Sequence, residues 1–202
     1  MRKWNVDMKE GEFIDEKIHA LRENYRIRTA EYDLCTDFIR FHTRSIRFRW
    51  FSLFDGLFRI LLPEDFTVMP KQIAAARYPC RYRPPVILSG PGYDEDFGFH
   101  LIKDEPGDLD SLIRPMRDSF LRHAPETVIY GQGHINLEEM DGVWFEYKNF
   151  TLDEETYGVQ FLIRSDADIL AGVFNSRMMF YDEWKPLVPK ILEQIKGKGE
   201  RY

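Results

Sequence analysis

The sequence of 202 residues is 44% hydrophobic and 31% charged, a balance that is typical of a globular protein with its own core and excludes a disordered chain. Its formal net charge of −6 argues against a general nucleic-acid binder, because contact with phosphates needs a concentrated positive field. No run approaches the roughly 20 apolar residues of a membrane span, so no membrane insertion is expected.

The cysteines and the first residues indicate the compartment. Cys35 and Cys80 lie far apart without CxxC or Cys/His spacing, which predicts two reduced thiols rather than a disulfide or a zinc site. Residues 1–11 carry charges throughout and contain no apolar stretch of the signal-peptide type. We therefore expect a cytoplasmic protein.

Residues 1–43 are interpreted as an N-terminal extension packed on a single domain of residues 44–202. Apolar residues at helical spacing predict a helix near 12–24, whereas residues 26–42 mix strand-forming and helix-tolerant types. The extension is expected to clamp either the domain or a second copy of it. A homo-oligomer is therefore one of the expected states.

The clearest local pattern lies in residues 46–62. Apolar residues alternate with arginines before Asp55-Gly56, a preferred type I′ turn pair, and a second apolar run follows the turn. This pattern predicts a β-hairpin. Residues 69–77 then predict a short helix with a proline in its first turn.

A second hairpin is predicted from strands at about 86–89 and 97–102, joined by a glycine-proline turn and an acidic tip, Asp94-Glu95-Asp96. Apolar residues at helical spacing over 109–120 predict the next helix, with Asp108 or Asp110 as its N-cap. Pro115 is expected to start or kink that helix.

The rest of the chain predicts four strands and a closing helix. The strands lie at about 127–130, 134–151, 156–164 and 168–175, the second interrupted by Met140-Asp141-Gly142, and their short turns favour antiparallel pairing. The helix carries an apolar stripe from Trp184 to Ile195, with Asp182 as a plausible cap. The predicted fold class is α+β: a mostly antiparallel, twisted sheet of roughly six to eight strands flanked by helices.

With these elements in order, the chain resembles the Mog/PsbP-like family, and in particular its bacterial members of unknown function, over roughly residues 46–196. The resemblance rests on element order and on four short motifs: Leu57-Phe58-Arg59-Ile60-Leu61-Leu62-Pro63, Arg77-Tyr78-Pro79, Arg83-Pro84 and Glu183-Trp184-Lys185-Pro186. It implies an antiparallel sheet between helices. It also implies partner binding, because one branch of the family binds a small GTPase and another binds photosystem components.

The segment Tyr78–Pro85 is the most unusual part of the sequence. It has three prolines among eight residues, which exclude a regular helix and fix an extended or turn backbone. Arginines in and beside it could bind a carboxylate or phosphate. The candidate ligand-binding or partner-binding residues are Arg77, Tyr78, Arg81, Arg83 and His100. The alternative is that the arginines pair with local carboxylates and that Tyr78 packs into the core.

Other chemistry has weaker support. None of the five histidines lies at a metal-ligand spacing, and His100 and His134 are the better candidates for a general base. The acidic groups at 94–96, 108 and 110, and 166 and 168 complete no calcium loop, so no metal site is predicted. The sequence contains neither a GxSxG nucleophile motif nor a phosphate-binding loop, and no cofactor is expected.

Two exposed patches are also conceivable from the sequence. Trp50, Trp144, Phe145 and Tyr147 could form an aromatic partner surface, and Arg44, Arg47 and Arg49 a basic row, although alternation alone predicts core for the aromatics and a solvated face for the arginines. The sequence therefore favours a non-enzymatic interaction domain with a protein partner. A small enzyme or a binder of an anionic ligand, using the Tyr78–Pro85 loop, is the alternative.

Overall fold

The computed structural model of the protein describes residues 33–36, 38–41, 44–80, 82–137, 140–150 and 154–198. The helix predicted near 12–24, and most of the N-terminal extension, lie outside these residues. The extension's described part has two features: Leu34 is buried in the core, and β1 (Ile39–Phe41) pairs with β2 (Arg44–Ile46). The division at residue 43 stays a prediction.

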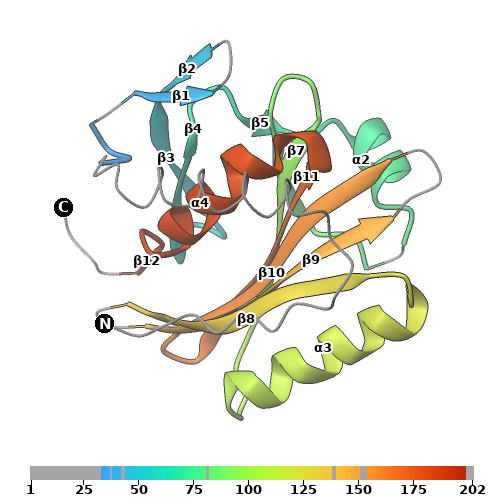
Figure 1. The fold of residues 1–202 in the computed structure, drawn as a ribbon. Coiled ribbons are helices and arrows are strands. Elements are labelled where there is room, and N and C mark those ends of the chain that lie inside the picture. The colour runs from blue at the N-terminus through green and yellow to red at the C-terminus, as the bar shows by residue number, and fades with distance from the viewer. Residues whose placement is uncertain are drawn as a thin grey trace, which may run out of the picture.

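A seven-stranded antiparallel sheet forms the centre of the molecule (Figure 1). Its strand order is β5-β6-β7-β11-β10-β9-β8. The strands are β5 (Thr67–Val68), β6 (Val86–Ser89), β7 (Glu95–Ile102), β8 (Val128–Asn136), β9 (Asp141–Phe150), β10 (Glu155–Ser165) and β11 (Asp168–Arg177). Every neighbouring pair is antiparallel, as the short connections predicted for β6–β7 and for β8 to β11; β7–β11 and β5–β6 are antiparallel as well, although helices lie between them in the chain. The α+β class is thus confirmed.

The predicted hairpin of residues 46–62 also exists, but it forms a separate sheet. Strands β3 (Phe48–Leu53) and β4 (Phe58–Pro63) pair with each other, and β12 (Lys196–Gly197) pairs with β4. The turn spans four residues, 54–57, and Phe54, Asp55 and Gly56 all have positive φ, so it is longer than the expected two-residue turn. The expectation of one sheet was therefore incomplete.

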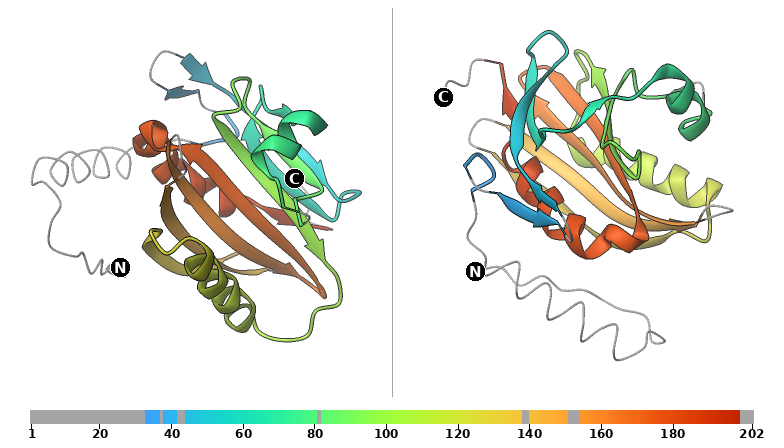
Figure 2. Two further views of the ribbon diagram at one scale, coloured as in Figure 1. Left: turned by 90° about the vertical axis from the view of Figure 1, so that its right-hand side faces the viewer. Right: turned by 90° about the horizontal axis from the view of Figure 1, so that it is seen from above.

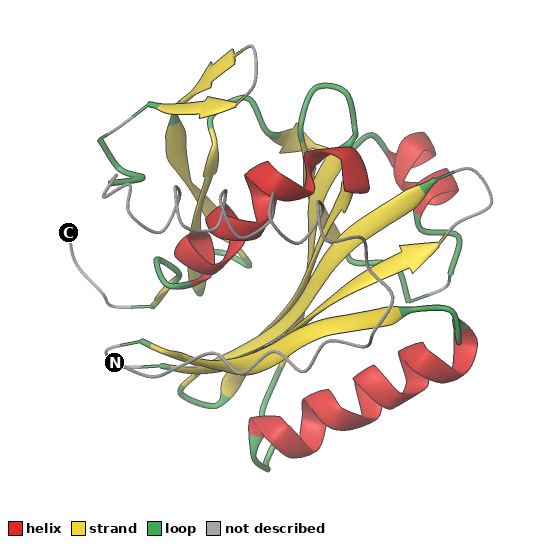
Figure 3. Cartoon of the chain, viewed as in Figure 1, coloured by secondary structure: helices red, strands yellow, loops and turns green. Residues whose placement is uncertain are grey.

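Three described helices cover the sheets (Figures 2 and 3): α2 (Lys71–Arg77), α3 (Leu109–His123) and α4 (Tyr181–Leu192), the last preceded by a 3₁₀ turn at Met178–Phe180. Figure 1 shows α3 on one side of the large sheet and α4 on the other, between the large sheet and β3–β4. None of the described helices is long and apolar enough to cross a membrane.

The alternation of side chains along the strands divides the core between the two faces. On β10, Tyr157, Phe161 and Ile163 pack with α4 and β4, whereas Leu162 packs with α3. The α4 side is the larger core and is built around Trp184, whose ring lies 4.9 Å from that of Phe174. The aromatic content of the sequence is therefore mostly core.

Three local predictions were wrong in detail. Residues 131–133 do not interrupt a strand, because β8 runs through them with only a bulge between Ile129 and Gly131. Glu95 and Asp96 do not form an exposed tip: both belong to β7 and are buried. At α4 the N-cap position is Phe180, so Asp182 lies in the first turn instead of capping it.

Candidate functional site

The candidate site begins where α2 ends and the proline-rich loop starts. Arg77, the last residue of α2, places its Nε 2.6 Å from Oδ2 of Asp96 on β7, and the hydroxyl of Tyr78 donates to Oδ1 of the same carboxylate. Asp96 is fully buried, and the Arg77 side chain is 26% exposed. A buried carboxylate thus joins the loop to the sheet. The alternative expected for Arg77, pairing with a nearby carboxylate, is what the structure shows.

The carboxylate belongs to a row of polar side chains across the sheet. In the strand register Asp96 lies opposite Asn175, Asn175 opposite Gly158, and Gly158 opposite Tyr147. The amide of Asn175 donates to the Tyr78 hydroxyl at 2.7 Å, and the Tyr147 hydroxyl donates to Oδ1 of Asn175 at 3.2 Å. Tyr147 can reach across because Gly158 has no side chain: a Cβ there would lie 2.3 Å from the tyrosine ring.

Burial dominates the electrostatics of this row. It raises the pKa of Asp96, against the lowering effects of the Arg77 charge and of hydrogen bonds from Tyr78, Asn175 and Arg77. Burial and the neighbouring Asp96 carboxylate also raise the pKa of Tyr78, so its hydroxyl keeps its proton and acts as a donor. Hydrogen bonds join Tyr78 and Asn175 to Oδ1 of Asp96, and Arg77 forms an ion pair with Oδ2, which is the arrangement of a structural network.

Tyr82, Arg83 and Pro84 of the loop are held by contacts to the loop backbone and to β7. Nε of Arg83 donates to the carbonyl of Tyr78 at 2.9 Å, and Nε2 of His100 lies 3.1 Å from the carbonyl of Tyr82. Pro84 packs on Gly98, where an added Cβ would lie 2.7 Å from the proline ring. Burial lowers the pKa of His100. Its ring therefore favours the neutral form, in which Nε2–H donates to the carbonyl.

The structure thus brings four of the five predicted site residues together: Arg77, Tyr78, Arg83 and His100. Arg81 lies outside the described residues. The four converge on Asp96 and on the backbone of the loop, and they line no part of the pocket described next. Among the described residues of the loop, Tyr82 is the large side chain presented outward, at 72% exposed, and the smaller side chains of Pro79, Cys80 and Pro85 are exposed as well.

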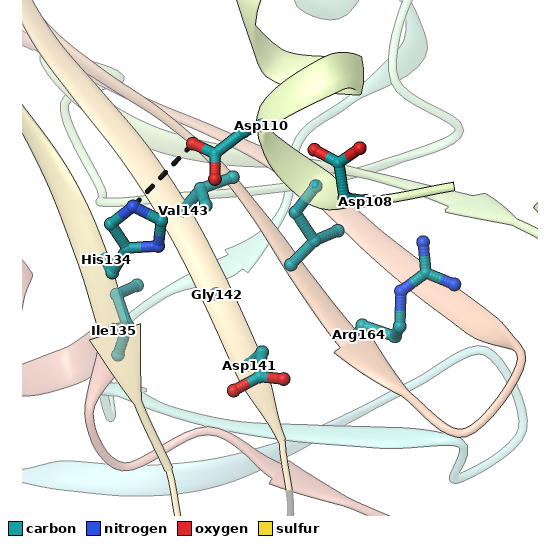
Figure 4. A pocket seen from close by; sticks show the side chains of 9 residues that line it. Asp108, Asp110, His134, Ile135, Asp141, Gly142, Val143 and Arg164 are labelled. Carbon is teal, nitrogen blue, oxygen red and sulfur yellow. Dashed lines mark ion pairs between the residues drawn. The ribbon is translucent and has the colours of Figure 1, made fainter. Parts of the chain in front are cut away.

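A pocket of about 250 Å³ lies elsewhere, between the start of α3 and the ends of β8, β9 and β10 (Figure 4). Its charged lining consists of Asp108, Asp110, His134, Asp141 and Arg164. Two of these groups have structural partners. Asp108 accepts from the backbone N–H and the hydroxyl of Ser111. Arg164 donates to the carbonyls of Glu105 and Gly107, in the loop before α3, at 2.9 and 2.6 Å.

His134, which the sequence singled out, lies in this pocket with its Nε2 3.7 Å from Oδ1 of Asp110 (Figure 4). Both side chains are more than half exposed, at 62% and 54%. Within the described part of the chain, no three His, Cys, Asp or Glu side chains converge closely enough to hold a metal ion.

The sequence did not reveal a second polar cluster, on the opposite face of the sheet beside α4. Glu146 accepts from the Tyr157 hydroxyl at 2.9 Å and from Lys185 at 3.3 Å, and Lys185 also donates to the Tyr181 hydroxyl at 2.6 Å. Its members come from β9, β10 and α4, so no local spacing could have marked it. The Lys185 motif in the sequence gave only the family resemblance.

Comparisons with known proteins identify the fold. No family model matches the sequence, and no curated protein matches it significantly. The structure is similar to cyanobacterial PsbP from Synechocystis sp. PCC 6803, with a TM-score of 0.57 and 8% identity over 79% of this chain and 97% of the other. It is also similar to the Ran-binding protein Mog1p of Saccharomyces cerevisiae, with a TM-score of 0.50 and 10% identity over 76% and 96% of the two chains. The chain thus has the Mog/PsbP-like fold that its motifs suggested.

Proposed function

We propose that the protein is a non-enzymatic, cytoplasmic interaction domain that binds a protein partner through the Tyr78–Pro85 loop. The observation that carries this proposal is the exposure of Tyr82 on a loop whose neighbouring residues are fixed. Tyr82 is 72% exposed, while contacts of Tyr78, Arg83, Pro84 and His100 hold the backbone on either side of it. An exposed aromatic side chain has few rotatable bonds, and on a fixed backbone it loses little conformational entropy when a partner covers it.

The chemistry beside Tyr82 specifies an acidic contact on the partner. Nε of Arg83 donates to the carbonyl of Tyr78 in the loop backbone. Its two Nη groups have no hydrogen bond or ion pair with any other described residue. A guanidinium in this state can bind a carboxylate with its remaining edge. Partner binding is also the role that Mog1p, a Ran-binding protein, has on this fold.

Site-specific crosslinking tests the proposal. A photoreactive phenylalanine analogue in place of Tyr82 should give one discrete protein adduct in cells, and the charge reversal Arg83→Glu should abolish that adduct. The same analogue at Ser52, an exposed residue of β3 on the separate small sheet, is the matched control and should give no such adduct. Equal adducts at both positions, or one that is insensitive to Arg83→Glu, would contradict the proposal.

The second candidate function is binding of a small anionic ligand by the same arginine. Titration with inorganic phosphate and with citrate, monitored by thermal unfolding, separates the two functions. A rise in the melting temperature of the wild type that is lost in Arg83→Ala would favour the ligand binder. No rise, together with the Tyr82 adduct, favours the protein partner.

A further inference from the structure

The two edges of the large sheet differ in length and protection. One edge is β5, which has only two residues. The other is β8, with nine residues, and no strand among the described residues pairs with its outer side. Natural edge strands are usually short or carry charges or proline, which prevent pairing with another chain.

Strand β8 has little of this protection. Its sequence, Val-Ile-Tyr-Gly-Gln-Gly-His-Ile-Asn, contains no Asp, Glu, Lys, Arg or Pro. Its one protective feature is the bulge between Ile129 and Gly131, which leaves a regular stretch from Gly131 to Asn136. An open stretch of this kind offers backbone N–H and C=O groups to one type of occupant, another extended strand.

We propose that this occupant is β8 of a second copy of the chain, paired antiparallel across a two-fold axis so that one sheet continues through both copies. A two-fold axis brings identical surfaces together, and a strand without Asp, Glu, Lys or Arg can face itself without repulsion between such side chains. The axis also places the Val128 end of each strand beside the Asn136 end of the other.

Charges on the flank of β8 favour this antiparallel arrangement. Helix α3 lies along the strand, with Nη1 of Arg117 donating to Oε1 of Gln132. At the Val128 end, α3 finishes in exposed Arg122 and His123. At the Asn136 end lie the carboxylates of the pocket, Asp108, Asp110 and Asp141. Exposed Glu126 also lies at the Val128 end and Arg164 at the Asn136 end, so the Asn136 end is the more acidic of the two. Antiparallel pairing therefore sets this acidic end beside Arg122 of the other copy, whereas parallel pairing sets the two acidic ends together.

Sedimentation velocity of the full chain with charge variants at Gln132 tests the pairing. The nine residues of β8 are centred on exposed Gln132, so antiparallel pairing over the whole strand, with Val128 opposite Asn136, brings residue 132 of one copy close to residue 132 of the other. We expect a wild-type dimer, with a dissociation constant raised roughly fivefold by Gln132→Lys and less by Gln132→Glu, because Arg117 partly neutralises the glutamate. An equimolar mixture of the two variants should recover the wild-type constant through a mixed dimer.

Circular dichroism of each variant shows that the monomer is still folded, and Ser52→Lys on the small sheet is the matched control, which should leave the dimer unchanged. A dimer whose dissociation constant is the same in all variants would overturn the pairing through β8. So would a wild type that sediments with the mass of one chain at all concentrations up to about 0.1 mM, a range in which specific homodimers ordinarily assemble.

Discussion

Asp96 is the residue on which the loop network depends, and its removal is the first prediction. Asp96→Ala leaves the Arg77 guanidinium and the Tyr78 hydroxyl without their shared acceptor. We expect the free energy of unfolding to fall by about 3 kcal/mol, since breaking a buried, hydrogen-bonded pair leaves its partners unsatisfied. Urea unfolding at neutral pH measures this change. A loss below about 1 kcal/mol would mean that the network does not hold the loop.

The same carboxyl predicts a pH dependence. Burial raises the pKa of Asp96 in the folded protein, so the folded state holds the proton more tightly than the unfolded chain does. The part of its contribution that depends on this proton is therefore complete below the unfolded pKa of about 3.9 and is lost as pH rises through the folded pKa, whereas the contacts removed by Asp96→Ala are a separate contribution.

Asp96→Asn, which does not titrate, isolates this contribution. The free energy of unfolding of the wild type minus that of the variant should decline as pH rises above about 4 and then level off. Urea titrations of both proteins at several pH values give this difference. A difference that grows with pH would show that the ion pair with Arg77 outweighs burial.

The third prediction for single residues concerns Gly158, which leaves room for the Tyr147 side chain. A Cβ at this position would lie 2.3 to 2.6 Å from ring atoms of Tyr147, which is closer than contacts allow. Gly158→Ala should therefore displace the tyrosine, break its hydrogen bond to Asn175 and lower the free energy of unfolding by about 2 kcal/mol. In a Tyr147→Leu background the same change should cost much less. Additive losses in the double variant would exclude the steric cause.

At the scale of elements, the N-terminus of α3 gives a prediction with a matched control. Asp108 accepts from the backbone N–H of Ser111 at 2.8 Å, whereas Asp110, two residues later, makes only a distant pair with His134. Asp108→Ala should lower the melting temperature by a few degrees and Asp110→Ala should change it little. Thermal unfolding followed by circular dichroism compares them.

The pH dependence of this cap is opposite to that of Asp96. Hydrogen bonds from Ser111 lower the pKa of Asp108, so the cap stabilises the protein above the unfolded pKa of about 3.9 and is lost as pH falls through the folded value. The difference in melting temperature between wild type and Asp108→Ala should therefore shrink below about pH 4. A difference that persists in acid would contradict the role of the ionised cap.

Most elements could be predicted because their patterns are local. Alternation of apolar and polar residues predicted the hairpin of β3 and β4, and apolar residues at helical spacing predicted α3 and α4. The sequence predicts a break at residues 131–133 because glycine usually weakens or ends a strand, but β8 runs through these residues. In this fold Gly131 and Gly133 lie beside the large side chains of Glu146 and Trp144, which occupy the space above them.

The candidate site was less predictable, because its central residue is defined by contacts distant in sequence. Asp96 follows a turn within an acidic run, which is the pattern of an exposed tip. Its burial depends on Arg77 and Asn175, which are 19 and 79 positions away along the chain. Sequence patterns identified the arginine-rich loop but not the carboxylate beneath it.

On the scale of the whole molecule, the two proposed surfaces lie at different parts of one sheet. The loop rests on β7, near the β5 edge, and the proposed self-pairing uses the β8 edge. Pairing through β8 would leave both loops uncovered and place one toward each end of the joined sheet. A dimer of this form can hold two partner molecules, or one partner with two sites, and gains avidity in the second case.

The last prediction concerns the N-terminal extension and compares two truncated chains. Leu34 is 4% exposed within the main core, and β1 pairs with β2 from Ile39↔Ile46 to Phe41↔Arg44. A chain of residues 44–202 loses both features, whereas a chain of residues 33–202 keeps them. We expect the shorter chain to be less stable to urea by about 3 kcal/mol, the cost of removing one large buried apolar side chain.

The longer truncated chain is the control for this loss and for the state of assembly. Because β8 lies wholly within both chains, both should still form the β8-paired dimer in sedimentation velocity under conditions in which they are folded. Equal stability of the two chains would mean that the extension is a passive tail. If neither truncated chain dimerised, self-association would depend on the first 32 residues and not on β8. The comparison thus separates the role of the extension from that of the sheet edge.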